Sequence, residues 1–491
     1  MAVGSSPSSP PRSGERISEG DLPGGGRRRP VRQGVRRDQV ICLALAVILL
    51  GLIGFLQPGL NRGRTGLVYV NNRSVGNLLL EFPRLTLGGF RGILAMVLWE
   101  DAQRDINRQR WVPLESDYNA IAALEPYFGS VYIFNAWNQS YNLSAQFHSL
   151  NTKYKWVLDG LVYLYKGERY APQNADIIKN EADDFFLKLG SSWERRYYCA
   201  RWRYDIAHLY EYNPHKVNPA FSTLAEVHDL VTRPEFHAVL LPARDGQGPP
   251  GHGVKINGIH YRYGLSPFYF AWVEYRRMLA QPELPHNEGI EILDSWPSMS
   301  LRYWCRDDLY YAQRLTWRIF HEPEKKMLAH FPARVENIRD CYRNVKRVAP
   351  QALAAFKKYL AKFPDQVLAR VHLVAEVQYY QALAPAESKL FEGLVQWQID
   401  DRRFRLGDAA DRDLAAAVPL FERARAAFTR FLNIAYPKGP KNQIGATRRN
   451  ELTYRHAVDM QIRGITNFRL RAAHHKPDLG FLNYQTLSDN N

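Results

Sequence analysis

The residues best placed to bind a ligand lie between positions 130 and 148. Asn135, Asn138 and Asn142 recur at helical spacing and share one stripe of a helix. The neighbouring stripe holds Phe134, Trp137 and Tyr141. An asparagine amide both donates and accepts hydrogen bonds, and aromatic faces stack on sugars and peptides, so we predict a binding groove here. In the alternative, which we favour, the asparagines satisfy backbone carbonyls of a neighbouring repeat.

A glycine-rich segment places one further candidate residue, Arg91, at an expected helix start. Residues 87–92 read LGGFRG, and free N–H groups with the positive end of a helix dipole attract anions. The segment is not a phosphate-binding P-loop, because it lacks the Gly-Lys-Ser/Thr ending. The favoured alternative is that another helix approaches Gly88 and Gly92 closely.

Two acids fall on apolar helix stripes, where a carboxylate must be paired or have a raised pKa. Asp308 lies among Leu301, Trp304 and Cys305, and Asp101 follows the stripe that ends at Leu98. Arg306 and Arg314 lie on the same helix as Asp308. A structural ion pair is favoured over a catalytic carboxylate, because no second acid is placed to share the chemistry.

No catalytic or metal-binding motif is present. The fourteen histidines form no H-E-x-x-H, and the chain has no G-x-S-x-G or G-x-G-x-x-G sequence. Cys199, Cys305 and Cys341 form no C-x-x-C and allow one disulfide at most, a pairing that the sequence leaves open. We predict no cofactor and no metal site, and we favour a non-enzyme while leaving catalysis open.

Helical periodicity dominates the chain after residue 90. The expected amphipathic segments are residues 90–102, 115–124, 130–148, 153–165, 175–189, 195–212, 299–320, 334–348 and most of 351–470. One stretch differs: residues 254–263 alternate around Asn257-Gly258, which predicts a β-hairpin with a type I′ turn.

An apolar, proline-free run at residues 40–56 predicts a transmembrane helix. It has no charged residue, and six arginines between positions 27 and 37 precede it, so the N-terminus is expected in the cytoplasm. A cleaved signal peptide is the alternative, but Gln57-Pro58-Gly59 offers no small-residue cleavage site. Residues 1–38 are too poor in apolar side chains to fold.

The charge balance limits the partners. The net charge is +16, and residues 1–38 contribute +4 of it through eight arginines and four acids, which leaves +12 for the rest. Outside the cytoplasm this favours anionic surfaces over nucleic acid, although charge spread for solubility is an equal alternative.

Residues 351–365 resemble one unit of a tetratricopeptide repeat (TPR). Ala352, Phe356, Pro364 and Leu373 match the family's positions, whereas Tyr359 and Val374 depart from its small residues. Residues 87–92, Leu98-Trp99, residues 124–126 and residues 136–144 (AWNQSYNLS) resemble motifs of bacterial membrane-anchored, TPR-like proteins of unassigned function. The resemblance implies a tethered helical-repeat body and no particular reaction.

These observations predict a mainly α fold: a TPR-like α-solenoid of helix pairs with an inserted β-hairpin, preceded by one transmembrane helix. The expected parts are a tail (1–38), the membrane helix (39–57), an N-terminal helical domain (67–235), a loop and hairpin insertion (236–295), a C-terminal helical domain (296–470) and a second tail (471–491).

The predicted function is that of a scaffold in the bacterial inner membrane that binds another protein outside the cytoplasm. The alternative is a cell-envelope enzyme or carbohydrate-binding module that acts on acidic glycan, with the 244–263 loop and hairpin as a specificity element.

Overall fold

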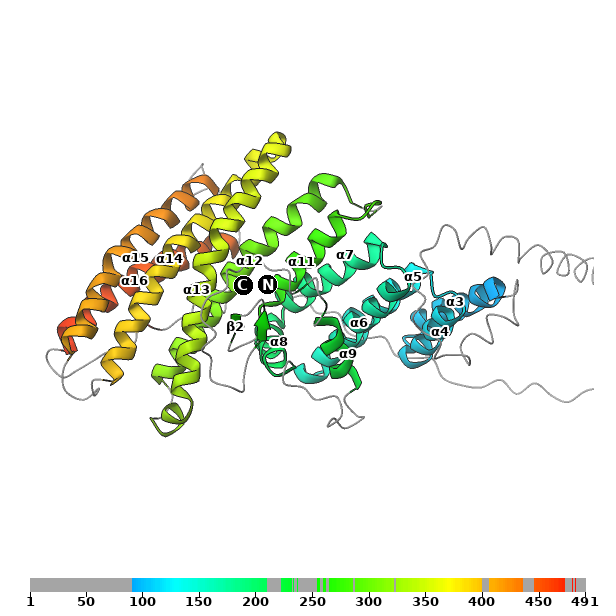
Figure 1. Ribbon diagram of the computed structural model, residues 1–491, viewed down its shortest axis with the longest axis horizontal. Coiled ribbons are helices and arrows are strands. Elements are labelled where there is room, and N and C mark those ends of the chain that lie inside the picture. Colours follow the sequence, from blue (N-terminus) through cyan, green and yellow to red (C-terminus); the bar gives the residue numbers. More distant parts are fainter. Residues whose placement is uncertain are drawn as a thin grey trace, which may run out of the picture. The chain divides into compact units, whose positions relative to one another are not determined.

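The computed structural model describes residues 91–209, 222–231, 233, 236, 254–256, 259–261, 265–285, 288–321, 324–399, 406–435, 446–472, 479 and 482. The predicted N-terminal tail, transmembrane helix and C-terminal tail lie wholly or mostly outside these residues. Helices make up nearly all of the described chain (Figure 1).

The first part of this helical body is built from short helices that follow one another closely. They are α3 (Arg91–Asn107), α4 (Trp111–Leu124), α5 (Gly129–Trp137), α6 (Leu150–Tyr170), α7 (Ala175–Asp183), α8 (Arg195–Leu209) and α9 (Ser222–Val231). α3 packs on α4, α5 on α6, and α6 on α7. Neighbours in the sequence are therefore mostly neighbours in space.

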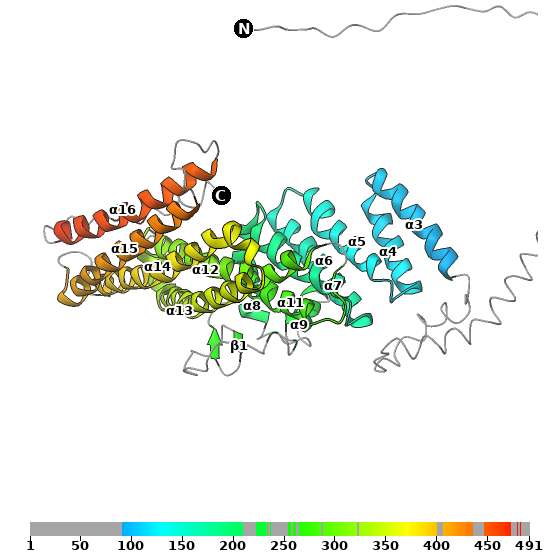
Figure 2. The same cartoon turned by 90° about the horizontal axis from the view of Figure 1, so that it is seen from above.

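The second part consists of long helices. After α11 (Pro267–Leu279) come α12 (Ile290–His321), α13 (Glu324–Lys362), a 3-10 turn η6 (Pro364–Gln366), α14 (Val367–Ile399), α15 (Asp408–Ala435) and α16 (Ala446–Ala472). Each packs against the next, and Figures 1 and 2 show α13, α14 and α15 side by side. The chain thus continues as a layer of antiparallel helices.

Helix ends follow local signals that the sequence carries. The Ser149 and Asn174 side chains accept hydrogen bonds from the N–H groups of Thr152 and Ile177, which caps α6 and α7. α11 begins with Ser266 as its cap and Pro267 in its first turn.

Two π-helical turns interrupt the regular pattern and lie next to each other. η2 (Asn138–Leu143) continues α5, and η3 (Asp184–Leu189) continues α7. The Ser140 hydroxyl donates to the Asp184 carboxylate at 3.0 Å and joins the two turns. Gly160 of α6 lets that helix approach, because a Cβ there would lie 2.8 Å from the Ala136 carbonyl oxygen.

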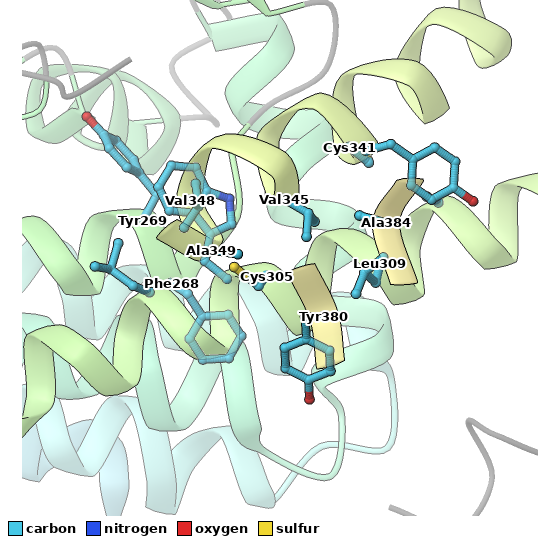
Figure 3. Close-up of a cluster of buried hydrophobic side chains, with 14 of the residues drawn as sticks. Phe268, Tyr269, Cys305, Leu309, Cys341, Val345, Val348, Ala349, Tyr380 and Ala384 are labelled. Carbon is cyan, nitrogen blue, oxygen red and sulfur yellow. The ribbon is translucent and has the colours of Figure 1, made fainter. Parts of the chain in front are cut away.

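A core shared by several helices joins the two parts. Figure 3 shows Phe268 and Tyr269 of α11 beside Cys305 of α12 and Val348 and Ala349 of α13. All five are buried. Cys199, Cys305 and Cys341 are buried free thiols, which answers the question of a disulfide among them.

Within the described residues, no helix combines the length and apolar character that a membrane span needs. Residues 40–56, where the transmembrane helix is predicted, lie outside them. The predicted fold class is wrong for residues 236–295. This segment is not only a loop and a hairpin, because it also contributes α11, a buried core helix. Among its described residues, the strands are β1 (Val254–Ile256) and β2 (Ile259–Tyr261), three residues each and paired antiparallel. α11 escaped detection because its first seven residues, 267–273, are all apolar and buried, so that half of the helix shows no amphipathic period.

Candidate functional site

The predicted asparagine stripe faces the interior. Asn135 and Asn138 are each 1% exposed. The Asn138 amide donates to the Tyr118 hydroxyl at 3.5 Å, and the Asn142 amide donates to the Asn138 carbonyl oxygen at 2.6 Å. These side chains bond to other side chains and not to the carbonyls of a neighbouring repeat. The structure therefore assigns the stripe to the polar interior of the helical body.

The aromatic stripe of the same helix faces outward. Phe134 is 44% and Trp137 49% exposed, and the Trp137 ring stacks on Tyr141 at a centroid distance of 6.3 Å. Sequence spacing identified both stripes correctly, but it could not show which of them faces solvent. Only the aromatic half of the predicted groove is available to a partner.

Trp99 of α3 connects these aromatic residues to the preceding helix. Its ring lies 5.5 Å from that of Phe134 and 5.9 Å from that of Phe128, centroid to centroid. α3 itself exposes Ile93, Leu94, Met96 and Val97, with Met96 at 73%. We call this surface the α3–α5 face; it comprises Ile93, Leu94, Met96, Val97, Trp99, Phe128, Phe134 and Trp137. The α3 residues were missed because an apolar stripe was assumed to be core.

Polar groups around η2 and η3 lie directly beneath the aromatic stripe. Burial raises the pKa of Asp184 to about 8, although its bond from Ser140 lowers it. Burial also lowers the pKa of Lys188, whose ammonium lies 4.7 Å from the centre of the Tyr141 ring. Asp184 is therefore largely uncharged at neutral pH. The described residues of η2 and η3 contain no second carboxylate that could share catalysis with Asp184.

Arg91 is part of an ion pair. Its Nε lies 3.1 Å from a carboxylate oxygen of Glu125, which ties the start of α3 to the end of α4. A Cβ added at Gly92 would meet no heavy atom within 4 Å, so the expected close approach of a helix there is wrong. Gly88 lies outside the described residues.

The two acids predicted on apolar stripes behave differently. Asp308 is buried and accepts a hydrogen bond of 2.5 Å from Arg203 of α8, so the predicted ion pair is confirmed, but its partner is neither Arg306 nor Arg314. Burial still raises the pKa of Asp308 to about 6. Asp101 is half-exposed and pairs with Arg104 one turn later, so it does not face the core.

A second buried ion cluster joins α6, α7 and α11. Arg233 contacts Glu168, Glu181 at 3.1 Å and Glu274 at 2.6 Å. Arg277 contacts the same Glu168 and, at 2.5 Å, Glu274. We call these five residues the Arg233 cluster. It joins three helices through ion pairs. The paired residues are far apart in the sequence, so the sequence alone does not indicate them.

The described residues contain no group of three or more His, Cys, Asp or Glu side chains arranged to hold a metal ion. Comparison of the chain with protein-family models, curated proteins and solved structures gave no match. The resemblance to tetratricopeptide-like proteins thus stays a prediction. Function must be argued from the surfaces described above.

Proposed function

We propose that this chain is a helical scaffold that binds another protein through the α3–α5 face. The observation that carries the proposal is the concentration of exposed apolar side chains on α3 and α5, which the Trp99–Phe134 ring contact joins. Met96, Val97, Phe134 and Trp137 are each between 44% and 73% exposed, and ring contacts through Trp99 make the surface continuous from α3 to α5. Contiguous exposed apolar surface of this kind is typical of protein–protein interfaces.

The chemistry of the face indicates an apolar partner surface. Trp, Phe and Met are the residues enriched where interfaces are most buried. The hydrogen bonds of Asn138 with Tyr118 and Asn142 tie η2, which continues α5, to α4, and a fixed helix lowers the entropy lost on binding. The proposed setting remains the outer side of a bacterial inner membrane.

The test is photo-crosslinking in intact cells, with a photoreactive amino acid at position 96 and mass spectrometry of the products. Trp137→Ala should abolish recovery of the cross-linked partner. Its melting temperature should stay near that of the parent, because truncation of an exposed side chain changes stability by about 0.5 kcal/mol or less.

Trp193→Ala is the matched control, since Trp193 is 96% exposed and lies outside the face. It should leave recovery unchanged. Equal recovery from the parent, Trp137→Ala and a Met96→Asp variant probed from position 134 would refute the proposal.

A further inference from the structure

Two side chains of η3, Asp184 and Lys188, contact consecutive residues of η2. The Ser140 hydroxyl donates to the Asp184 carboxyl at 3.0 Å. The Lys188 ammonium lies 4.7 Å from the centre of the Tyr141 ring. Such π-helical turns are rare and occur most often at functional sites. The two turns therefore meet through ionisable groups at both contacts.

Tyr141 connects these contacts to the α3–α5 face. Its ring stacks on Trp137 at a centroid distance of 6.3 Å and an interplanar angle of 21°. Trp137 is the last residue of α5 and belongs to the exposed face, whereas Tyr141 is half-buried. A change in what holds Tyr141 thus reaches a side chain through which the partner is proposed to bind.

The surroundings of Asp184 favour its protonated form. Its side chain is buried, and the hydrogen bond from Ser140 brings no charge. Burial accordingly raises the pKa of Asp184 to about 8. Once ionised, the buried carboxylate requires a cation. Lys188 can supply it, because side chains four residues apart on a helical turn lie on the same side.

Lys188 therefore has two competing partners. In the structure its ammonium lies over the Tyr141 ring, whose quadrupole attracts a cation. An ionised Asp184 would attract the same ammonium more strongly, because it offers a full negative charge that little water screens. Burial lowers the pKa of Lys188, and the charge of Asp184 raises it, so the ammonium keeps its proton when it pairs with the carboxylate.

The elements packed on η3 bring further titratable groups close to Asp184 and Lys188. They are Tyr141 of η2, Lys153 of α6, Asp183 and Lys179 of α7, Glu194 and Cys199 at α8, Tyr275 of α11 and Glu288 before α12. Lys179 forms an ion pair of 2.7 Å with Asp183, and Lys153 forms one of 2.8 Å with Glu194. Because both of these lysines are engaged, Lys188 is the cation that an ionised Asp184 attracts.

We propose that the proton on Asp184 controls partner binding at the α3–α5 face. With the carboxyl protonated, Lys188 lies over Tyr141 and holds its ring against Trp137. When the proton leaves for solvent, the ammonium moves to the carboxylate, and the stack on Trp137 loses the side chain that held it. The effect on binding rests on the function proposed above, whereas the movement of Lys188 does not.

Fluorine NMR of the purified full-length chain, labelled with 5-fluorotryptophan, tests the movement. Trp137→Phe identifies the resonance of Trp137 by its loss. In the parent this resonance should shift between pH 6 and pH 9.5, with a midpoint of about pH 8. Asp184→Asn keeps an acceptor for Ser140 but cannot ionise, and Lys188→Gln removes the ammonium. Each of these two variants should abolish the shift.

Lys155→Gln is the matched control, because Lys155 is an exposed lysine of α6 and its loss changes the net charge equally. This variant should titrate as the parent does. Thermal melting at each pH shows whether a variant is folded, and Lys188→Gln decides the outcome if Asp184→Asn does not fold. A Trp137 resonance that does not shift in the parent would overturn the proposal, as would a shift that persists in Asp184→Asn or in Lys188→Gln.

Photo-cross-linking from position 96 in isolated membranes, at pH 6 and at pH 9, tests the effect on binding. At pH 9 about nine-tenths of Asp184 is ionised, so recovery of the partner should fall about tenfold in the parent and stay constant in Asp184→Asn. Equal recovery from the parent at both pH values, with a Trp137 resonance that shifts, would overturn the proposal. If the resonance shifts but no partner is recovered at either pH, the proposed function is refuted and the movement of Lys188 is supported.

Discussion

Arginine side chains have different surroundings in the Arg233 cluster and at the cavity between α8 and α12. In the cluster, Arg233 and Arg277 are buried among Glu168, Glu181 and Glu274, so every guanidinium has carboxylate neighbours. The cavity is lined by Arg195 and Arg196 of α8, by Arg306 and Arg314 of α12, and by Asp307, which is itself bound to Arg203 and Ser266. In the cluster, pairing with carboxylates fixes the packing of the helices, whereas Arg306 at the cavity lies over the Tyr303 ring at 4.2 Å.

The cluster also shows how this protein balances buried charge. Three carboxylates face two arginines, so one acid must hold a proton for the group to be neutral. Burial raises the pKa of Glu181 well above its ordinary value, and the nearby Glu168 raises it further. We infer that Glu181 is the protonated member, with Arg233 as a hydrogen-bond donor to it at 3.1 Å.

The largest expected effect is the loss of stability in Arg233→Ala. The change leaves Arg277 alone among three buried carboxyl groups, and removal of one partner from a buried ion pair costs about 3–5 kcal/mol. Chemical denaturation measures it. Glu181→Gln is the matched control and should cost much less, because the amide keeps an acceptor for Arg233 and leaves both arginines with carboxylate partners. A loss below about 1 kcal/mol in Arg233→Ala would mean that the cluster does not hold the helices together.

A second prediction concerns pH, and it extends the comparison to Asp184, a buried acid whose hydrogen bond comes from the neutral hydroxyl of Ser140. Asp184 has a folded pKa of about 8, above its ordinary value, so the folded state binds a proton that the unfolded state has released. Its contribution to stability is therefore largest at low pH and is lost as the pH rises toward 8, by about 1.4 kcal/mol per pH unit at most.

Asp184→Asn removes this titration while keeping an acceptor for Ser140. The variant should gain stability relative to the parent at pH 8 and much less at pH 5, as measured by urea denaturation at both values. Asp411→Asn provides the comparison, because the hydrogen bond from Arg469 at 2.6 Å lowers the pKa of Asp411. A parallel pH dependence in the parent and Asp184→Asn would show that Asp184 is ionised in the folded protein.

A smaller loss is expected for a neutral buried group. Asn138→Ala removes the hydrogen-bond partner of the Asn142 amide and of the Tyr118 hydroxyl. We expect the free energy of unfolding to fall by about 1–3 kcal/mol. Partner recovery through the α3–α5 face should fall only in proportion to the unfolded fraction. If the melting temperature were unchanged and the cross-linked partner were no longer recovered, the asparagine stripe would instead be part of the binding surface.

For the α3–α5 face and the asparagine stripe, the sequence predicts the helix and its two stripes but not which stripe is buried. The spacing of residues 134–142 established a helix with one polar and one aromatic stripe, because helical period depends on local geometry alone. Which stripe is buried depends on α4 and α6, and neither is encoded in that segment. The expected rule, apolar in and polar out, fails here because Tyr118 and Asn142 satisfy the buried Asn138.

Local sequence therefore determined the helices and their caps, as at Asn174 and Ser266, and required that a buried Asp308 be paired. Tertiary structure decided which cation pairs with it: Arg203, 105 residues away. It also decided that α11 is a core helix, that Glu168, Glu181 and Glu274 meet around Arg233, and that four arginines from α8 and α12 face one cavity. Spacing within a helix fixes only a side chain's direction, whereas electrostatic pairing depends on distances between helices that only packing sets.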